Sequence, residues 1–199
     1  MEAEYLLVGL GNPGPEYENS PHNAGFEVAR RLRALCRGPQ FSVRSDALVS
    51  ACRWRGHAVV AALPQTYMNR SGEAVARLLR ALDLPLDRLV VCYDDLALPF
   101  GTLRLRPYGG PGGHHGMESV LAHLGSDRFP RIRIGICDPG IPKERTVDYL
   151  LEPLPADRWT LLAEASEQGA RAALDAIHMG WSKAMSLHNK RAEEASPEG

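Results

Sequence analysis

Short apolar runs and amphipathic helical patterns alternate along this chain, and this alternation restricts the possible folds more than any other feature. The runs are rich in β-branched residues and are bounded by Gly, Pro or Asp, as buried strands usually are. The segments between them repeat apolar residues every three or four positions, which is typical of helices with one buried face. This order predicts an α/β fold in which helices cover both faces of a central sheet. The expected strands cover residues 5–10, 58–63, 89–93 and 132–137, and the expected helices cover 26–35, 75–82, 117–124 and 159–177.

The segment 47–56, ALVSACRWRG, predicts one further strand that would turn tightly at Gly56 into the run 58–63. Strands joined by so short a turn pair in antiparallel fashion, whereas strands joined through helices can pair in parallel. The sequence therefore predicts a mixed central sheet. At 199 residues the chain is expected to form a single globular domain over residues 1–188, followed by a disordered polar tail over residues 189–199.

Composition and charge argue against several classes of protein. Apolar residues make up 44% and charged residues 24%, and no apolar stretch reaches the roughly 18 residues of a membrane span. A net charge of −1 disfavours a protein that wraps duplex nucleic acid. Glu2 and Glu4 stand where a signal peptide would be basic, so we expect a cytoplasmic protein with no membrane partner. Two arginine clusters, in GTLRLRPYGG and SDRFPRIRIG, are dense enough to hold a few phosphates.

Glycines follow the first apolar run at positions 9, 11 and 14, in the spacing G-x-G-x-x-G. In dinucleotide-binding proteins this spacing cradles a pyrophosphate at a helix N-terminus. Here Pro13 and Pro15 remove two backbone N–H donors, and no acidic residue follows at the expected distance of about 20 residues. A dinucleotide-binding oxidoreductase stays as a remote alternative, because the arginines of RLRALCRG could serve an NADP phosphate. The run is otherwise expected to form a tight turn that exposes Asn12.

Side chains suited to acid–base catalysis lie near other apolar runs. Asp94 and Asp95 come directly after an expected buried strand, where a carboxylate needs a partner. His22 is the best-placed histidine, because a carboxylate that binds one imidazole nitrogen leaves the other nitrogen free to act as a general base. A glycine-rich loop precedes His114 and His115, and it could bring backbone N–H groups to a phosphate or an extended ligand.

Other kinds of site are less well supported by the sequence. Adjacent histidines tend to point apart, and no H-x-x-x-H or H-x-E pattern accompanies the seven histidines. The four cysteines are scattered singly without a C-x-x-C pair, and no G-x-S-x-G motif is present. We therefore expect neither a metal site nor a covalent acyl-enzyme. Asn69, after the run 58–63, is as readily a turn or cap residue as a site residue.

Five longer motifs occur in this order: VGLGNPGPEYENSPHNAG, TYMNRSG, YDDLALPFG, GGPGGHHG and PRIRIGICDPG. Together they resemble the bacterial-type peptidyl-tRNA hydrolase family over residues 6–154, and the first of them is highly specific. The resemblance implies a monomeric α/β globule with a mixed central sheet. It also implies hydrolysis of the ester between a peptide, or an N-blocked aminoacyl group, and the 3′ end of tRNA, which recycles tRNA from stalled translation. The implied partner is peptidyl-tRNA, and neither a metal nor an organic cofactor is implied.

The resemblance also assigns roles to individual residues. His22 would be the general base that activates water, Asp94 would orient and stabilise it, and Asn12 would favour an N-blocked group. Arg106 and Arg133 would clamp a phosphate near the acceptor end of the tRNA. The residues expected to contact the tRNA end or the peptide are Tyr17, Tyr67, Met68, Asn69, Gly113, His114 and His115.

Three positions depart from the family pattern. Ser20 and Pro21 precede His22 where the family usually has Thr-Arg, which changes the approach to the base and removes a charge. His115 replaces an asparagine that binds substrate, and an imidazole cannot both donate and accept as a planar amide does. Ala97 stands where an aspartate is common. These departures leave open a second function, a weakly active or inactive family member that binds RNA or protein.

Overall fold

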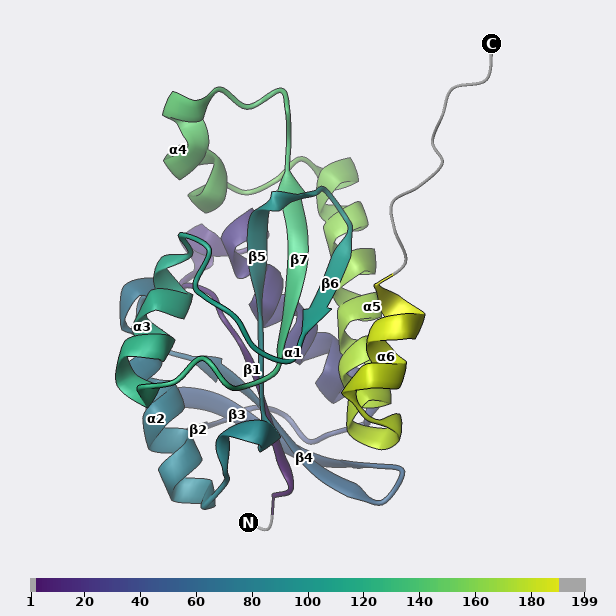
Figure 1. Ribbon diagram of the computed structural model, residues 1–199. Helices are drawn as coiled ribbons and strands as arrows, with labels where there is room; N and C mark the ends of the chain where they lie inside the picture. The colour runs from purple at the N-terminus through teal and green to yellow at the C-terminus, as the bar shows by residue number, and fades with distance from the viewer. Residues whose placement is uncertain (1–2, 190–199) are drawn as a thin grey trace.

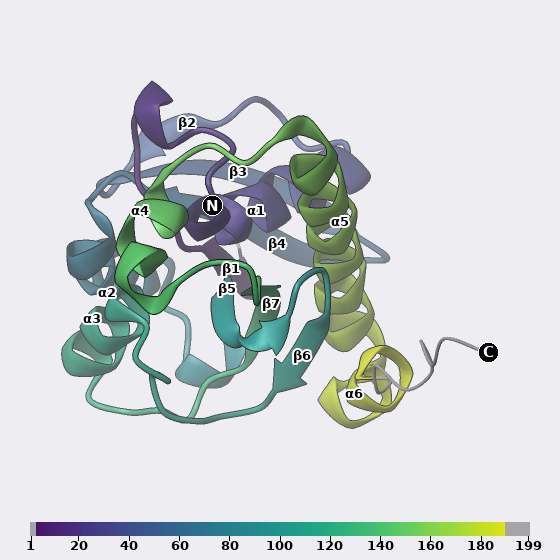
Figure 2. The same cartoon turned by 90° about the horizontal axis from the view of Figure 1, so that it is seen from above.

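The computed structural model describes residues 3–189 and shows a mixed sheet between two layers of helices (Figure 1, Figure 2). The described strands are β1 (Tyr5–Gly9), β2 (Ser42–Arg44), β3 (Ala47–Trp54), β4 (His57–Pro64), β5 (Leu89–Pro99), β6 (Leu103–Arg106) and β7 (Arg131–Cys137). Their order in the sheet is β2-β3-β4-β1-β5-β7-β6. Strands β4, β1, β5 and β7 are parallel, while β2 and β3, β3 and β4, and β6 and β7 pair in antiparallel fashion.

Helices lie on both faces of this sheet, as Figure 2 shows. One face is covered by α1 (Ala24–Leu35), α5 (Ala156–Met179) and α6 (Trp181–His188), and the other by α2 (Ser71–Leu82) and α3 (His115–Leu124). A short helix, α4 (Thr146–Leu151), lies above the ends of β5 and β7 in Figure 1. The described 3₁₀ turns are η1 (Pro15–Tyr17), η2 (Pro21–Asn23), η3 (Met68–Arg70), η4 (Leu86–Arg88) and η5 (Lys143–Arg145).

The core consists of two apolar clusters, one on each face of the sheet. Successive side chains of a strand point to opposite faces, so Leu7 on β1 packs toward α1 and α5, whereas Leu6 and Val8 pack toward α2 and α3. This two-sided burial explains why the central strands read as uninterrupted apolar runs. The predicted α/β class, the mixed sheet and the antiparallel pair at the turn Arg55–Gly56 are all confirmed.

Several elements differ from the sequence predictions. The expected strand 89–93 continues to Pro99, so Asp94 and Asp95 lie within β5, paired with β7, rather than after the strand. Continuation is possible because both carboxylates have partners: Asp94 contacts His22 and His114, and Asp95 contacts Arg133. The sequence analysis did not anticipate β2, β6, α4 or α6, which are short and carry many charged or exposed residues.

The C-terminal part of the described chain lies against the edge strand β6. Asn189, which the sequence assigned to the tail, accepts a hydrogen bond from Leu105 N at 2.7 Å and donates one to Leu105 O at 3.0 Å. The side-chain amide thus satisfies backbone groups that an edge strand leaves unpaired. The rest of the expected tail, residues 190–199, lies outside the described residues. No helix within residues 3–189 is long and apolar enough to cross a membrane.

The glycine run after β1 permits close packing of backbone on backbone. A Cβ atom on Gly9 would lie 1.9 Å from the carbonyl oxygen of Gly25, at the start of α1. The chain then forms the 3₁₀ turn η1 at Pro15 instead of a helix whose N-terminus could face a pyrophosphate. The run therefore serves the contact between β1 and α1, which leaves the dinucleotide-binding alternative without structural support.

Substituting Gly25 by alanine is expected to destabilise the protein by about 3 kcal/mol or more. The new Cβ would lie 2.3 Å from Cys92 O and 2.5 Å from Leu10 N, and both are buried backbone atoms that cannot rotate away. Urea unfolding should show the midpoint falling by about 1 M or more. Gly110→Ala is the matched control, since a Cβ there meets nothing within 4 Å. Similar midpoints for the two variants would contradict this account of the packing.

Candidate active site

The polar residues selected from the sequence meet at the carboxyl ends of the central strands. From β1 the chain passes to α1 on one face of the sheet, and from β4 it passes to α2 on the other face. Neighbouring parallel strands whose connections leave to opposite faces open a crevice at their carboxyl ends. The segment after β1 borders two spaces at this end of the sheet, one shared with the end of β4 and a second shared with the later part of β5 and the loop before α3.

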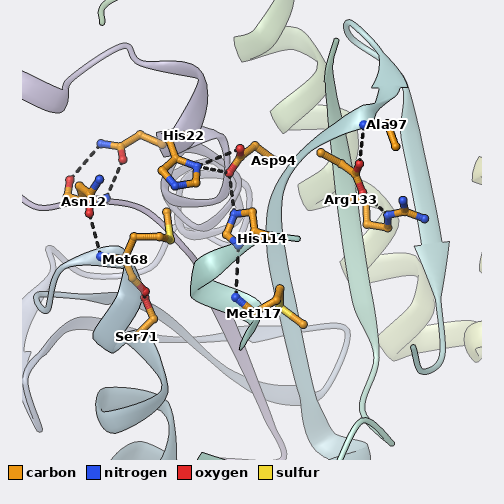
Figure 3. Close-up of polar contacts among 11 residues, drawn as sticks. Asn12, His22, Met68, Ser71, Asp94, Ala97, His114, Met117 and Arg133 are labelled. Carbon is orange, nitrogen blue, oxygen red and sulfur yellow. Dashed lines mark hydrogen bonds and ion pairs between the residues drawn. The ribbon is translucent and has the colours of Figure 1, made fainter. Parts of the chain in front are cut away.

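His22 and Asp94 form a buried pair in the second of these spaces (Figure 3). The Nδ1 atom of His22 lies 2.9 Å from each carboxylate oxygen of Asp94. Nδ1 therefore carries the proton that it donates, which leaves the lone pair on Nε2. Within residues 3–189 no group forms a hydrogen bond with that Nε2 atom. This is the arrangement of a general base held in one tautomer by a carboxylate.

The charge state of the pair follows from its surroundings. Burial opposes a charged imidazole most strongly, but the negative charge of Asp94 and its hydrogen bond outweigh burial and raise the pKa of His22. Burial likewise opposes the charge on Asp94, yet His22 and His114 together hold the pKa of this carboxyl well below its usual range. Asp94 is thus an anion at neutral pH, and its charge makes His22 a stronger base than an isolated buried imidazole.

His114 is the second partner of Asp94 and the N-cap of α3. Its Nδ1 accepts a hydrogen bond from Met117 N at 3.2 Å, so its Nε2 carries a proton and donates to Asp94 Oδ1 at 2.9 Å. The ring also packs edge-on to Tyr93, with centroids 4.9 Å apart. Two imidazole N–H groups therefore hold one carboxylate in place, and the start of α3 fixes the tautomer of the second imidazole.

The same three side chains are the described group most suited to hold a metal ion. Ligand atoms of His22, Asp94 and His114 lie within 4.8 Å of one another, and two histidines with a carboxylate can bind transition metals. A metal at His114 Nε2 would need the lone pair of that atom, but Met117 N–H directs the proton there. A metal-binding histidine instead donates its other N–H to an acceptor. The contacts of His114 thus fit a hydrogen-bonded chain better than a metal site.

Asn12 is buried, with 7% of its surface exposed, and this corrects the expectation that the glycine turn exposes it. Its Oδ1 accepts a hydrogen bond from Met68 N at 2.8 Å, and its backbone is bound to the Asn23 side chain at 2.7 and 3.1 Å. Because Oδ1 is occupied, the orientation of the amide is fixed and its Nδ2 remains as a donor. Asn23 directly follows His22, so this contact also ties the base to the turn after β1.

The Ser20-Pro21 departure is accommodated by the local backbone. Ser20 is extended and Pro21 opens the 3₁₀ turn η2, a position where its fixed φ fits and its missing N–H costs nothing. Asn23 N donates to Ser20 O at 3.1 Å and closes the turn. Pro21 therefore supports the conformation that directs His22 toward Asp94.

A cleft of about 490 Å³ opens in front of the pair. His22, Asp94, Gly113, His114 and His115 line one part of it, which brings together five of the residues selected from the sequence. The apolar wall of the cleft consists of Leu96 on β5 and of Val147 and Leu150 on α4. The cleft thus places a base and a carboxylate beside an apolar surface.

His115 lines the outer part of this cleft and lies away from Asp94. Its side chain is 76% exposed, and its Nδ1 lies 3.1 Å from a carboxylate oxygen of Glu118 one turn along α3. The adjacent histidines do point apart, as expected from their positions. The substitution at position 115 therefore leaves the contacts of His22, Asp94 and His114 intact.

Arg106 and Arg133 border a second hollow of about 340 Å³, next to the cleft. Asp95 and Gly112 line both spaces, so the hollow and the cleft adjoin. Asp95 accepts a hydrogen bond from Arg133 Nε, and this contact orients the guanidinium (Figure 3). The two predicted phosphate-binding arginines therefore lie together beside the pair of His22 and Asp94.

The other residues selected from the sequence lie around the turn after β1. Met68 is buried and bound to Asn12, whereas Tyr67 and Asn69 on either side of it are exposed. Tyr17, in η1, is half-buried. Met68 and Gly116 are close neighbours, which brings η3 against the start of α3, while Asn12 lines a separate hollow of about 290 Å³.

The sequence analysis missed three contacts that shape the site. It gave His114 a substrate-binding role and did not foresee its hydrogen bond to Asp94. It assigned no role to Asn23, and it overlooked the pairing of Asp95 with Arg133. The H-N pair in the sequence could have indicated a role for Asn23, because a residue that directly follows a candidate base lies close to that base in the structure. The pairing of Asp95 with Arg133 depends on the register of β5 and β7 and carries no local signal.

Comparison with known proteins agrees with this geometry. Residues 6–196 match the family described as Peptidyl-tRNA hydrolase. The chain is 46% identical over 184 residues to the peptidyl-tRNA hydrolase of Desulforudis audaxviator, covering 92% of each chain. It is 39% identical over 186 residues to that of Persephonella marina, covering 93% of this chain and 97% of the relative.

Solved structures show the same similarity in three dimensions. The crystal structure of peptidyl-tRNA hydrolase from Acinetobacter baumannii superimposes with a TM-score of 0.86 at 31% identity, covering 95% of this chain and 97% of the other. A peptidyl-tRNA hydrolase in complex with N-propanol gives a TM-score of 0.87 at 30% identity, covering 96% of both chains. By sequence and by structure, this chain belongs to the peptidyl-tRNA hydrolase family.

Proposed function

We propose that this chain hydrolyses the ester bond between a peptide, or an N-blocked aminoacyl group, and the 3′ end of tRNA. One observation carries the proposal: the Nε2 atom of His22 is left without a partner among the described residues, in a cleft where Asp94 fixes the opposite nitrogen. Membership of the family supplies the substrate class. The substitutions at positions 21, 97 and 115 leave this pair intact, so the alternative of an inactive RNA- or protein-binding member is not favoured.

The reaction begins when His22 Nε2 takes a proton from water, whose oxygen attacks the ester carbonyl carbon. The carbonyl oxygen becomes an oxyanion, and Asn12 Nδ2, held by the Met68 contact, is the proposed donor to it. The bond from carbon to the tRNA 3′ oxygen then breaks, and His22 returns its proton to that oxygen. The products are tRNA with its hydroxyl restored and a peptide carboxylic acid, which releases its proton to solvent and becomes a carboxylate.

The rest of the cleft accounts for substrate selection. The apolar wall formed by Leu96, Val147 and Leu150 suits peptide side chains near the ester. Tyr67 and Asn69 are proposed to contact the tRNA end from η3, with Tyr17, Gly113 and His115 completing the contacts. The reaction needs no metal in this scheme, because a neutral imidazole and amide donors suffice for an activated ester.

The direct test is release of tRNA from N-acetyl-aminoacyl-tRNA by the purified protein, with and without EDTA. Equal release under both conditions is expected. Absence of release would overturn the proposed function, and release that EDTA abolishes would overturn the metal-free mechanism.

We further infer that the protein acts as a monomer in the cytoplasm. Its four cysteines, Cys36, Cys52, Cys92 and Cys137, are free thiols, which agrees with a reducing compartment. Peptidyl-tRNA is formed there during translation. Light scattering coupled to gel filtration should give the mass of one chain.

Arg133→Ala is expected to weaken tRNA binding and to lower the slope of log affinity against log salt by about one charge. Arg133 lines the hollow beside the cleft and has no contact with His22, so cleavage of a minimal N-acetyl-aminoacyl ester should stay close to that of the wild type. Binding would be followed by fluorescence anisotropy over a range of salt concentrations. Arg171→Ala is the control, since Arg171 is an exposed arginine that pairs with Glu167 along α5 and does not line the hollow. Equal losses on tRNA and on the minimal ester would contradict a role in phosphate binding.

A further inference from the structure

Tyr108 is an exposed aromatic side chain to which the proposed reaction assigns no role. It lies in the loop that runs from β6 to α3 (Figure 1), and 64% of its surface is exposed. Tyr108 lines two hollows: the space of about 340 Å³ that holds Arg106 and Arg133, and a second space of about 560 Å³ that holds Asp127 and Arg128. The ring is therefore accessible, and it borders a hollow in which arginines outnumber carboxylates on one side and the Asp127 and Arg128 side chains on the other.

The loop that carries Tyr108 is held to the sheet by one buried guanidinium. Arg131, on β7, has 1% of its surface exposed, and its Nη1 donates to Gly110 O at 3.1 Å. Its Nη2 donates to Asp127 O at 2.9 Å, and Gly109 N donates to the same carbonyl at 3.4 Å. The two segments that form the hollows around Tyr108 are thus bound to each other. A ring on such a support loses little conformational freedom when a ligand stacks on it.

The charges around the ring favour a nucleic acid over a peptide. Arg106, Arg128 and Arg133 outnumber the two carboxylates that line the same hollows, Asp95 and Asp127, and phosphodiester groups are the complementary anions. Proteins that bind single-stranded nucleic acid combine a basic groove with aromatic side chains on which bases stack. The apolar wall suited to a peptide lies elsewhere, at Val147 and Leu150.

We propose that Tyr108 stacks on an unpaired base of the RNA whose neighbouring phosphate is bound by Arg106 and Arg133. The Asp127 carboxylate, which lines the second hollow, is a suitable acceptor for the exocyclic amine of adenine, cytosine or guanine. This proposal rests on the proposed function, because it takes the end of tRNA as the ligand. It extends the RNA contact from the phosphate to a base, and so adds a binding site next to the cleft.

The test is fluorescence anisotropy with an RNA hairpin that carries an unpaired 3′ overhang. Tyr108→Ala should weaken binding by about 5-fold or more, whereas Tyr108→Phe, which keeps the ring, should bind within about 2-fold of the wild type. Neither variant should change the salt slope, because no charge is lost. Wild type and Tyr108→Ala should bind the same hairpin with equal affinity when its overhang is abasic. The control is Val43→Ala, an exposed apolar side chain on β2 at the opposite edge of the sheet.

The stacking site would be overturned if Tyr108→Ala bound the hairpin with wild-type affinity. It would also be overturned if Tyr108→Ala lost as much affinity for the abasic hairpin as for the intact one. A loss in Tyr108→Phe equal to that in Tyr108→Ala would also overturn it, since the hydroxyl would then be responsible. Cleavage of N-acetyl-aminoacyl-tRNA by the wild type is measured in parallel. If cleavage is absent but the effect of Tyr108→Ala on the hairpin persists, the proposed function fails and the stacking site stands.

Discussion

Replacing His22 by alanine lowers kcat/KM for N-acetyl-aminoacyl-tRNA by about 10² or more, which is the expected loss when a general base is removed. The loss should appear in kcat, because Arg106, Arg133 and the apolar wall of the cleft are untouched. Affinity for tRNA, measured by anisotropy, should therefore change little. Steady-state kinetics on the purified variant, with the urea midpoint measured alongside, separates loss of the base from loss of the fold.

A matched control for this variant is His57→Ala. His57 also pairs with a carboxylate, since its Nδ1 lies 3.0 Å from Glu4 Oε2, but it begins β4 at the end of the sheet away from the cleft. The two substitutions remove the same kind of side chain and the same kind of pair. His57→Ala should keep close to wild-type kcat/KM. If His22→Ala were equally active, the base would have to be another group and the proposed mechanism would be wrong.

The fold could be predicted because its main signals are local. The apolar runs at residues 5–10 and 58–63 could be recognised as strands, since their burial on both faces leaves no polar positions. Segments that lack a clear period, such as Ser42–Arg44 or Trp181–His188, are fixed by contacts with the rest of the fold, and no local pattern marks them.

The site could be predicted in part, because the later parts of neighbouring parallel strands, and the residues that follow them, lie at one end of the sheet. That rule brings His22 to Asp94 across 72 positions in the sequence. It does not indicate that Met68 N donates a hydrogen bond to Asn12 Oδ1, or that His114 points toward Asp94 while His115 points outward. Those orientations depend on η3 packing against the start of α3 and on the cap that His114 forms there.

The second large effect is expected for Asp94→Asn, with kcat/KM lowered by about 10² to 10⁴. Asp94 accepts N–H groups from both His22 and His114, and an asparagine can accept with only one of its two side-chain atoms. The amide NH₂ would face one imidazole N–H, and rotation of that ring or a change of tautomer would relieve the conflict. His22 would then no longer be held with Nε2 free, although the substituted residue has nearly the same size.

The pH profile distinguishes this explanation from simple loss of structure. His22 acts as a base only when neutral, so wild-type kcat/KM should rise with pH through a pKa above the ordinary value of about 6.5, because Asp94 raises it. In Asp94→Asn that charge is gone while burial, which lowers the pKa of His22, remains. The rising limb should therefore move to lower pH at the same time as the plateau falls. If the rising part of the profile stayed at the same pH in a folded variant, Asp94 would not act through His22.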